Sequence, residues 1–444
     1  MNQVNAQQKV FSEKEFLAVV KKFHPVIRLT ANRMELSRLN ITGARGGFDP
    51  QWKTQQFQKE FDGLTYYHQS FHELKLPTWY GIDLHLGHEK INGDRINPEE
   101  TKGQLSYIGF TVPLVQNLVM DKRRAALQTA KNYFALSDVE RRIEVNNLVK
   151  ESLEAYWKWW EQYHIHQLMI RGLRNSEKRL EFVRTAYQLG DRAAIDTLEA
   201  FTQVQSFQIK IAETLAASTN AKMELSIYLW TENNGQVSLS QDIIPEEYTN
   251  EDDVLSDEIF NASVSHPEIQ QYEYKLKALQ IERRLKFQLL LPQVNLKYNQ
   301  LNREFDKMFN AGWFSNNYNY GLVIAMPLRL SEGRAEYSRA GIKIENARIE
   351  QSNKRVQLQV KLRQCFTEWQ QNLNQLSLQD KMVQNTATLL KAEETRFLNG
   401  ESNLFLINAR ELKLIETEQK LIELRTKTRQ NYIKLQWAAG LYGG

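Results

Sequence analysis

The pattern of apolar and polar residues predicts helices far longer than those of an ordinary globular domain. Between residues 362 and 397, positions that step alternately by four and three residues are apolar at nine of eleven places. They are Leu362, Phe366, Trp369, Leu373, Leu376, Asp380, Val383, Ala387, Leu390, Glu394 and Phe397. Such a repeat is the seam of a coiled coil, along which helices pack side by side. Residues 332–398 would form one helix about 100 Å long.

The seam is interrupted and then resumes, which predicts that the helix folds back on itself. After Gly400 the apolar series continues at Ile407, Leu414, Leu421 and Leu435. A glycine inside a helix costs about 1 kcal/mol relative to alanine, whereas glycine and asparagine adopt the left-handed conformation that ends a helix. We therefore predict a reversal at Asn399-Gly400. A matching seam precedes Gly190, with Tyr156, Trp159, Tyr163, Ile170, Leu173, Leu180 and Tyr187.

Shorter stretches alternate apolar with polar or small residues, which predicts β-strands with one apolar face. These stretches are 80–87, 104–112, 294–299 and 318–326. In the last, Tyr318, Tyr320, Leu322, Ile324 and Met326 fall on one face. Lengths of about 9–11 residues suit strands that cross a membrane. The sequence thus predicts four strands, within about 78–113 and about 292–327.

The prolines expose an internal repeat. His24-Pro25 recurs at His266-Pro267, and Pro113 recurs at Pro327. Farther along, the offset settles at 210 residues, which pairs Gly190 with Gly400. We interpret the chain as two copies of one unit. Repeat 1 covers 1–240, with a helical hairpin at about 118–230. A linker covers 241–265, and repeat 2 covers 266–444, with a hairpin at about 332–438.

An insertion distinguishes the first copy from the second, and an acidic segment links the two. The first copy carries an insertion of about 27 residues between Pro50 and Pro77. The acidic segment 245–258 links the copies, and we expect it to wrap around the helices. Each copy reads as helix, strand, strand, helix, helix. The predicted fold class is therefore α+β and mainly α, built from two tandem repeats.

Composition excludes several classes of protein. The formal charge of +4 on 444 residues is small, and no concentrated basic patch occurs, so nucleic-acid binding is not expected. The single cysteine, Cys365, excludes an intrachain disulfide and fits a buried structural thiol. Without a run of 18 apolar residues, no transmembrane helix is predicted. No signal peptide is visible, which fits a cytosolic protein or a chain whose leader was removed.

The sequence shows no recognisable catalytic or metal-binding constellation. It contains no HExxH, P-loop or nucleotide-binding glycine motif. His164 and His166 stand two residues apart on a predicted helix and so point to different faces. The aromatic run 156–164 favours packing between helices over a substrate path. We expect no enzyme activity, no cofactor and no metal.

The strands carry an implication about assembly. Four strands cannot close a barrel, and an open sheet edge is not viable in lipid. Two chains would supply eight strands, whose interior is filled by side chains, whereas three would supply twelve, enough for a lumen. A barrel joined to long paired helices is a conduit.

At this point the chain resembles the TolC family of outer-membrane efflux and secretion channels, over nearly its whole length. The matching features are the His-Pro starts, Pro113-Leu114, Pro327-Leu328 and the helix reversals. "YQLGDRAAIDTLEA" (187–200) fits the family pattern well, whereas "FLNGESNLFLINARE" (397–411) departs from it at Leu406, where the family often has an acid. The insertion resembles the branch found in Bacteroidetes.

The resemblance implies a homotrimer with a 12-stranded β-barrel in the outer membrane of a Gram-negative bacterium and an α-helical barrel through the periplasm. The partners would be outer-membrane lipid, a periplasmic adaptor (membrane fusion protein) and an inner-membrane transporter. The docking tips would be Tyr187, Leu189, Gly190, Asp191, Phe397, Asn399, Gly400 and Glu401. Asp196 and Glu199 would line the aperture. Alternatively, they are solvated acids favoured by the helix dipole.

Two other functions remain open on the sequence alone. A soluble coiled-coil scaffold would account for the heptads and the missing leader, but not for strands that recur at matched positions. A secreted pore-forming toxin would assemble its barrel only on a target membrane. The transported substrate and the cognate pump are not encoded in any recognisable pattern.

Overall fold

A computed structural model describes residues 9–233, 235–240, 242–249, 259, 266–305 and 317–443. The acidic segment 245–258 and the loop after residue 305 lie partly outside these residues. The chain divides into two compact units, and each contains parts of both predicted repeats. The helical unit is Met1–Asn32, Val139–Ile269 and Asn353–Gly444; the sheet unit is Arg33–Asp138 and Gln270–Ser352.

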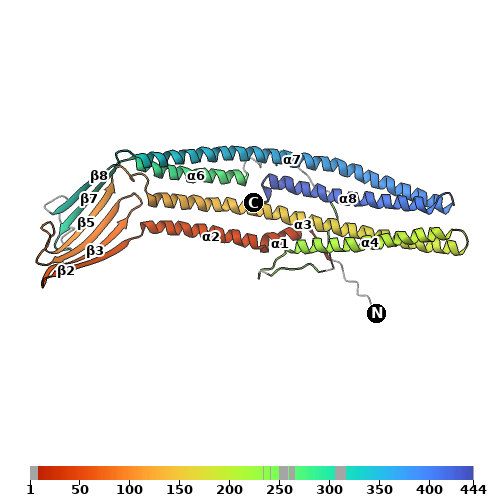
Figure 1. Ribbon diagram of the computed structural model, residues 1–444, viewed down its shortest axis with the longest axis horizontal. Coiled ribbons are helices and arrows are strands. Elements are labelled where there is room, and N and C mark those ends of the chain that lie inside the picture. Colours follow the sequence, from red (N-terminus) through yellow and green to blue (C-terminus); the bar gives the residue numbers. More distant parts are fainter. Residues whose placement is uncertain are drawn as a thin grey trace. The chain divides into compact units, whose positions relative to one another are not determined.

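Long helices dominate the described part of the chain (Figure 1). In chain order they are α1 (Glu13–Phe23), α2 (Pro25–Arg45), α3 (Lys122–Gln188), α4 (Ala194–Ser226), α6 (Pro267–Phe287), α7 (Ser331–Leu398) and α8 (Leu404–Ala438). Short 3₁₀ turns occur at Gly46–Phe48, Gln288–Leu290 and Leu441–Gly443. Helix α7 occupies the range where the coiled-coil seam predicted one.

The helical unit is organised around the aromatic run of α3. Tyr156, Trp157, Trp159 and Trp160 are all buried and pack against α1, α4 and α8. The indole nitrogen of Trp157 donates a hydrogen bond to the carboxylate of Glu13 at 2.7 Å. The interpretation of this run as packing residues is confirmed, and the run also anchors the N-terminal helix.

The segment from Lys9 to Glu15 is fixed by a small parallel sheet and a capping box. The Ser12 hydroxyl accepts the backbone N–H of Glu15, and the Glu15 carboxylate accepts that of Ser12, both at 3.2 Å. These contacts satisfy two otherwise unpaired donors at the start of α1. Strand β1 (Lys9–Phe11) pairs in parallel with β6 (Ile243–Pro245).

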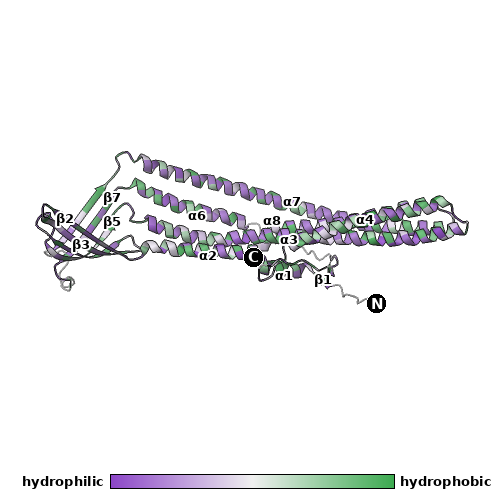
Figure 2. Cartoon of the chain, turned by 60° about the horizontal axis from the view of Figure 1, so that its bottom comes forward, coloured by the Kyte–Doolittle hydropathy of each residue, from purple (hydrophilic) through white to green (hydrophobic). Residues whose placement is uncertain are grey.

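The helices contain both polar and apolar residues rather than being uniformly apolar. Hydrophilic and hydrophobic residues alternate along each of them (Figure 2). Within the described ranges, no helix is both long enough and apolar enough to cross a membrane.

The sheet unit holds one antiparallel sheet of six strands in the order β2-β3-β4-β5-β7-β8. The strands are β2 (Gln51–Phe61), β3 (Leu64–Pro77), β4 (Asp83–Asn92), β5 (Gly103–Pro113), β7 (Gln293–Asn302) and β8 (Tyr318–Ala325). The ends of α2 and α6 and the starts of α3 and α7 adjoin the sheet along the chain.

The prediction of four strands was wrong, because the insertion between Pro50 and Pro77 folds into β2 and β3. These strands form a hairpin that extends the sheet beyond β4. Strand β2 has polar residues on both faces, so it shows no apolar alternation that would have revealed it. Asp62-Gly63 was the sequence signal for this hairpin. The two residues form the turn between β2 and β3, with left-handed φ angles of 54° and 72°.

Candidate functional site

The two helix reversals share one backbone geometry. Gly190 and Gly400 have φ angles of 82° and 76°. The N–H of Gly190 donates to the carbonyl of Tyr187, and that of Asp191 to Ala186. The equivalent bonds join Gly400 to Phe397 and Glu401 to Arg396, at 3.1 and 2.8 Å. This is the Schellman motif, which closes a helix end when the residue after the last turn is left-handed.

The helices that leave the turns are capped differently. Asn403 precedes α8, and its side chain accepts the backbone N–H of Leu406 at 2.9 Å. Ala193 holds the same place before α4 and has no side-chain acceptor. Substituting a capping side chain by alanine typically costs about 1 kcal/mol. The second turn is therefore locally better fixed than the first.

The two hairpins share a core close to the turns. Buried side chains from α3, α4, α7 and α8 meet there: Leu180, Val183, Ala200, Val204, Leu390, Phe397, Leu404 and Ile407. The guanidinium of Arg192, from the first turn, lies 4.2 Å from the centre of the Phe397 ring. The turns are thus held side by side as one end of the helical unit.

A buried polar contact also ties the hairpins together. Arg179 on α3 donates to the carboxylate of Glu411 and, at 3.1 Å, to the side-chain oxygen of Asn408, both on α8. Asn408 in turn donates to the Glu199 carboxylate on α4 at 3.2 Å. Glu411 is 2% exposed. A carboxylate this deep requires its cation, because an unpaired buried charge is strongly destabilising.

Most residues expected to dock an adaptor lie on the surface of the turns. Tyr187, Leu189, Gly190, Asp191, Asn399, Gly400 and Glu401 are all exposed. Phe397 is only 5% exposed and belongs to the shared core. Other apolar side chains are exposed beside them, namely Ile195, Leu198, Leu398 and Phe405. The sequence prediction did not single out these four.

The two acids expected to line an aperture lie on α4 and are half-buried. Asp196 is in the first turn of α4, where the helix dipole favours a carboxylate. Glu199 is engaged by Asn408. Both interpretations of these acids therefore remain predictions.

The strand register separates an apolar face of the sheet from a polar one. On β4 and β5, Leu84 lies opposite Phe110 and Leu86 opposite Ile108. The same face continues over β7 and β8 with Val294, Leu296, Tyr298, Tyr320, Leu322 and Ile324. Side chains alternate between the faces of a strand, so Asp83, His85, Glu89, Asn295, Lys297 and Asn299 belong to the other face.

The apolar face of the sheet ends at a row of side chains that crosses β2, β3, β4 and β5. Trp52, Leu74, Leu86 and Ile108 stand in one row across β2, β3, β4 and β5. The next row, away from the helices, is polar, with Thr54, His72, His88 and Ser106. The apolar band thus has a defined boundary on the side away from the helices.

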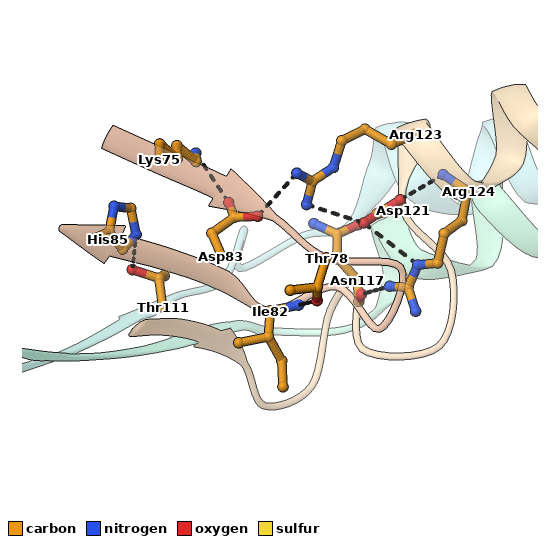
Figure 3. A network of polar contacts seen from close by, with 10 residues as sticks. All are labelled: Lys75, Thr78, Ile82, Asp83, His85, Thr111, Asn117, Asp121, Arg123 and Arg124. Atoms are coloured by element: carbon orange, nitrogen blue, oxygen red, sulfur yellow. Dashed lines mark hydrogen bonds and ion pairs between the residues drawn. The ribbon is translucent and has the colours of Figure 1, made fainter. Parts of the chain in front are cut away.

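A network of charged groups fixes the junction between the sheet and α3 (Figure 3). Asp83, at the start of β4, accepts from Lys75 at 3.0 Å and from Arg123 at 2.9 Å. Arg123 also pairs with Asp121 at 3.5 Å. Asp121 accepts the backbone N–H of Arg124 at 2.8 Å and so caps α3. The Arg124 guanidinium reaches the carbonyl of Asn117 in the connecting loop.

Next to this network, the polar face of the sheet holds a second set of contacts. The Tyr107 hydroxyl donates to the Glu73 carboxylate at 2.8 Å, and His85 lies 3.7 Å from the same carboxylate. The other ring nitrogen of His85 is 3.0 Å from the Thr111 hydroxyl. Sequence reasoning missed these residues because they come from three strands and no short motif connects them.

Three histidines lie in the helical unit, outside the sheet: His24 and His266 are buried, and His164 is half-buried. Burial lowers the pKa of His24, His164 and His266 below the ordinary value for an imidazole. His164 stacks on Trp160, and its Nδ1 lies 2.8 Å from the Trp160 carbonyl. His164 and His166 do not converge on one site. Among the described residues, no group of three or more candidate ligands could hold a metal ion.

Comparison with known proteins supports the family resemblance. Residues 259–441 match the family model of outer membrane efflux proteins. No curated protein sequence matches the chain.

Solved structures match the fold over most of the chain. The Campylobacter jejuni CmeC outer membrane channel is 13% identical, with a TM-score of 0.67 over 96% of this chain and 85% of that one. The open state of the Neisseria gonorrhoeae MtrE outer membrane channel is 14% identical, with a TM-score of 0.67 over 96% and 88%. The Vibrio cholerae outer membrane protein VceC is 14% identical, with a TM-score of 0.64 over 96% and 95%. The expected resemblance is confirmed, and these likenesses concern the fold.

Proposed function

We propose that this chain is one protomer of an outer-membrane channel that serves a tripartite efflux pump or a type I secretion system. It would be a passive conduit from a periplasmic adaptor and an inner-membrane pump to the exterior. The observation that carries this proposal is the strand register, which gives the sheet one apolar and one polar face. Such a sheet suits a wall between lipid and water.

The sheet needs further copies of the chain to form that wall. Its edges, β2 and β8, run in opposite directions because all neighbours in the sheet are antiparallel. The β8 edge of one copy can therefore pair with the β2 edge of the next. In a homotrimer, as the resemblance implies, this pairing gives eighteen strands. The twelve expected from the sequence rested on four strands per chain.

The widths of the two layers favour the larger barrel. Six strands about 4.8 Å apart and tilted by roughly 40° span about 37 Å of the barrel's circumference. Four strands would span only about 25 Å. The four helices that adjoin the sheet span about 36–40 Å if neighbouring axes are roughly 9–10 Å apart. Six strands per copy thus match a ring of four helices per copy.

The turns at Gly190 and Gly400 would be the end that meets the adaptor. Their exposed apolar residues, such as Leu189 and Leu398, offer the kind of surface that a partner covers. In an assembled ring, Asp196 and Glu199 would be repeated around the axis, where a concentration of carboxylates favours cations. We propose no catalytic step, because the family matched is one of transport proteins.

Fractionation of native cells, followed by recordings in planar bilayers, tests this proposal. The chain is expected in the outer-membrane fraction, and the purified protein is expected to conduct ions. Recovery in the cytosol would favour the coiled-coil scaffold. Recovery in the medium, with insertion into foreign membranes, would favour the pore-forming toxin. Either result would overturn the channel proposal.

A further inference from the structure

The sheet unit contains a cavity that the channel function does not require. Its volume is about 640 Å³, and its walls come from the segment after β5, the start of α3, the end of α6 and the first half of α7. The lining includes Leu118, Met120, Phe287, Leu291 and Ile344. Met120 and Ile344 in this lining are buried, whereas Leu118, Val119 and Phe287 are exposed. The cavity is therefore an apolar recess with an apolar mouth.

Three arginines line the same cavity: Arg283 and Arg284 on α6, and Arg348 on α7. The only other titratable lining residue among those described is Tyr337, and the guanidinium of Arg283 lies 4.7 Å from the centre of its ring. The recess thus combines hydrocarbon walls with three positive charges and no acid in its described lining.

The neighbouring acids on α6 and α7 are paired with other cations. Glu282 accepts from Lys343 at 2.8 Å, and Glu336 pairs with Lys286 at 2.6 Å and with Arg339. Within the described part of the chain, no ion pair or hydrogen bond is found for the three lining arginines. Their charge is available to a ligand, and arginine binds phosphate oxygens in a two-pronged geometry.

We propose that this cavity binds an anionic phospholipid, with the phosphate at the arginines and the start of an acyl chain along the apolar wall. The proposal rests on the proposed function, because it needs a sheet that stands in a bilayer. The lining begins at Val115, two residues beyond the end of β5. In the proposed channel, that position would lie at the headgroup level of the leaflet on the helical side, where basic residues attract anionic headgroups.

Lipid competition in nanodiscs tests the site. The purified assembly is delipidated and placed in nanodiscs that contain phosphatidylcholine and phosphatidylglycerol with the same acyl chains. Lipid that remains bound after extraction is counted by native mass spectrometry. The wild type is expected to enrich phosphatidylglycerol at least tenfold, and inorganic phosphate is expected not to displace it. Displacement by inorganic phosphate would mean that the site takes a free anion rather than a lipid.

Charge-neutralising variants make the test specific. The triple variant R283Q/R284Q/R348Q is expected to lose the enrichment, and R348Q alone is expected to weaken it several-fold. R348Q serves if the triple variant does not assemble. R363Q is the control, because Arg363 is exposed on the same helix and outside the cavity. It is expected to match the wild type.

Two kinds of failure can be told apart. Equal retention of both lipids by an assembly that enters the nanodisc would overturn the lipid site and leave the channel proposal intact. The same conclusion follows if R363Q loses the enrichment as fully as the triple variant, or if a neighbouring copy fills the cavity. Failure to enter any bilayer would overturn the channel proposal and the site together.

Discussion

At the scale of single residues, conformation and burial decide which side chains can be exchanged. The glycines at the two turns have left-handed backbones, so only residues without a Cβ fit there at low cost. The acid at position 411 is deeply buried, and the guanidinium of Arg179 is its cationic partner. The first requirement comes from backbone conformation and the second from the burial of a charge, so they can be tested separately.

Replacing Gly400 by valine is expected to destabilise the turn by about 1–2 kcal/mol, because an L-residue is strained in the left-handed region. A Cβ at this position would meet no described atom within 4 Å, so the cost arises in the backbone. Thermal unfolding measures it, and binding to a cognate adaptor should fall in parallel. Gly341→Ala is the control, since Gly341 lies within α7 and also has open space. Its stability should rise slightly, and unchanged stability in Gly400→Val would contradict the account.

Arg179→Ala is expected to cost about 3–5 kcal/mol, because it leaves the Glu411 carboxylate buried without its cation. The matched control is Arg171→Ala, which removes a pair with Glu418 on the same two helices. The Arg171 side chain is 59% exposed, so this change should cost less than about 1 kcal/mol. Denaturant unfolding compares the stability of the two variants. Equal losses of stability would contradict the conclusion that Glu411 needs Arg179 as its buried partner.

The lowered pKa of His164 predicts that the stability of the fold decreases in acid. Burial lowers the pKa of His164 in the folded state, so the unfolded chain binds the proton more readily. The free energy of unfolding is therefore unaffected by His164 above about pH 6.5, and it decreases as the pH falls below that value. His164→Gln should flatten this dependence between pH 7.5 and pH 5. Midpoints of unfolding at the two pH values test this, and an unchanged slope would show that His164 does not contribute.

At the scale of elements, the regular patterns in the sequence predicted most of the helices and the central strands. The seam over 362–397 specifies a helix because its period fits one continuous face. The strands β7 and β8 were visible because one of their faces is apolar. The β2–β3 hairpin was missed because Gln55, Gln56 and their neighbours give no alternation. The contacts of Asp83 and Arg179 join residues far apart in sequence, which no local pattern can reveal.

Cysteine pairs can identify the strand that forms the seam between copies. In a Cys365→Ser background, Thr54→Cys on β2 is combined with single cysteines at positions 318–322 of β8. At least one pair is expected to form a disulfide between copies, because β2 is the free edge of the sheet. The comparison series uses His88→Cys on β4, the edge that a twelve-stranded barrel would require. Cross-links from His88→Cys but not from Thr54→Cys would contradict the eighteen-stranded barrel.

At the scale of the whole molecule, three features of the chain need partners outside it. The sheet has two unpaired edges, its apolar face exposes Tyr320, Leu322 and Ile324, and the turns expose further apolar residues. Free edges and exposed apolar surface are normally paired or covered in a native assembly. Copies of the chain, a bilayer and an adaptor would cover all three.

Electron microscopy of the detergent-extracted protein tests this central claim most directly. We predict a particle with three-fold symmetry, a detergent belt around the strands and a hollow helical tube of about 100 Å, the length of a helix such as α7. At sufficient resolution, the belt should enclose eighteen strands. A closed barrel of twelve strands would contradict the pairing of β2 with β8 between copies, but it would still support the channel. A water-soluble monomer, or a rod without a lumen, would contradict the account.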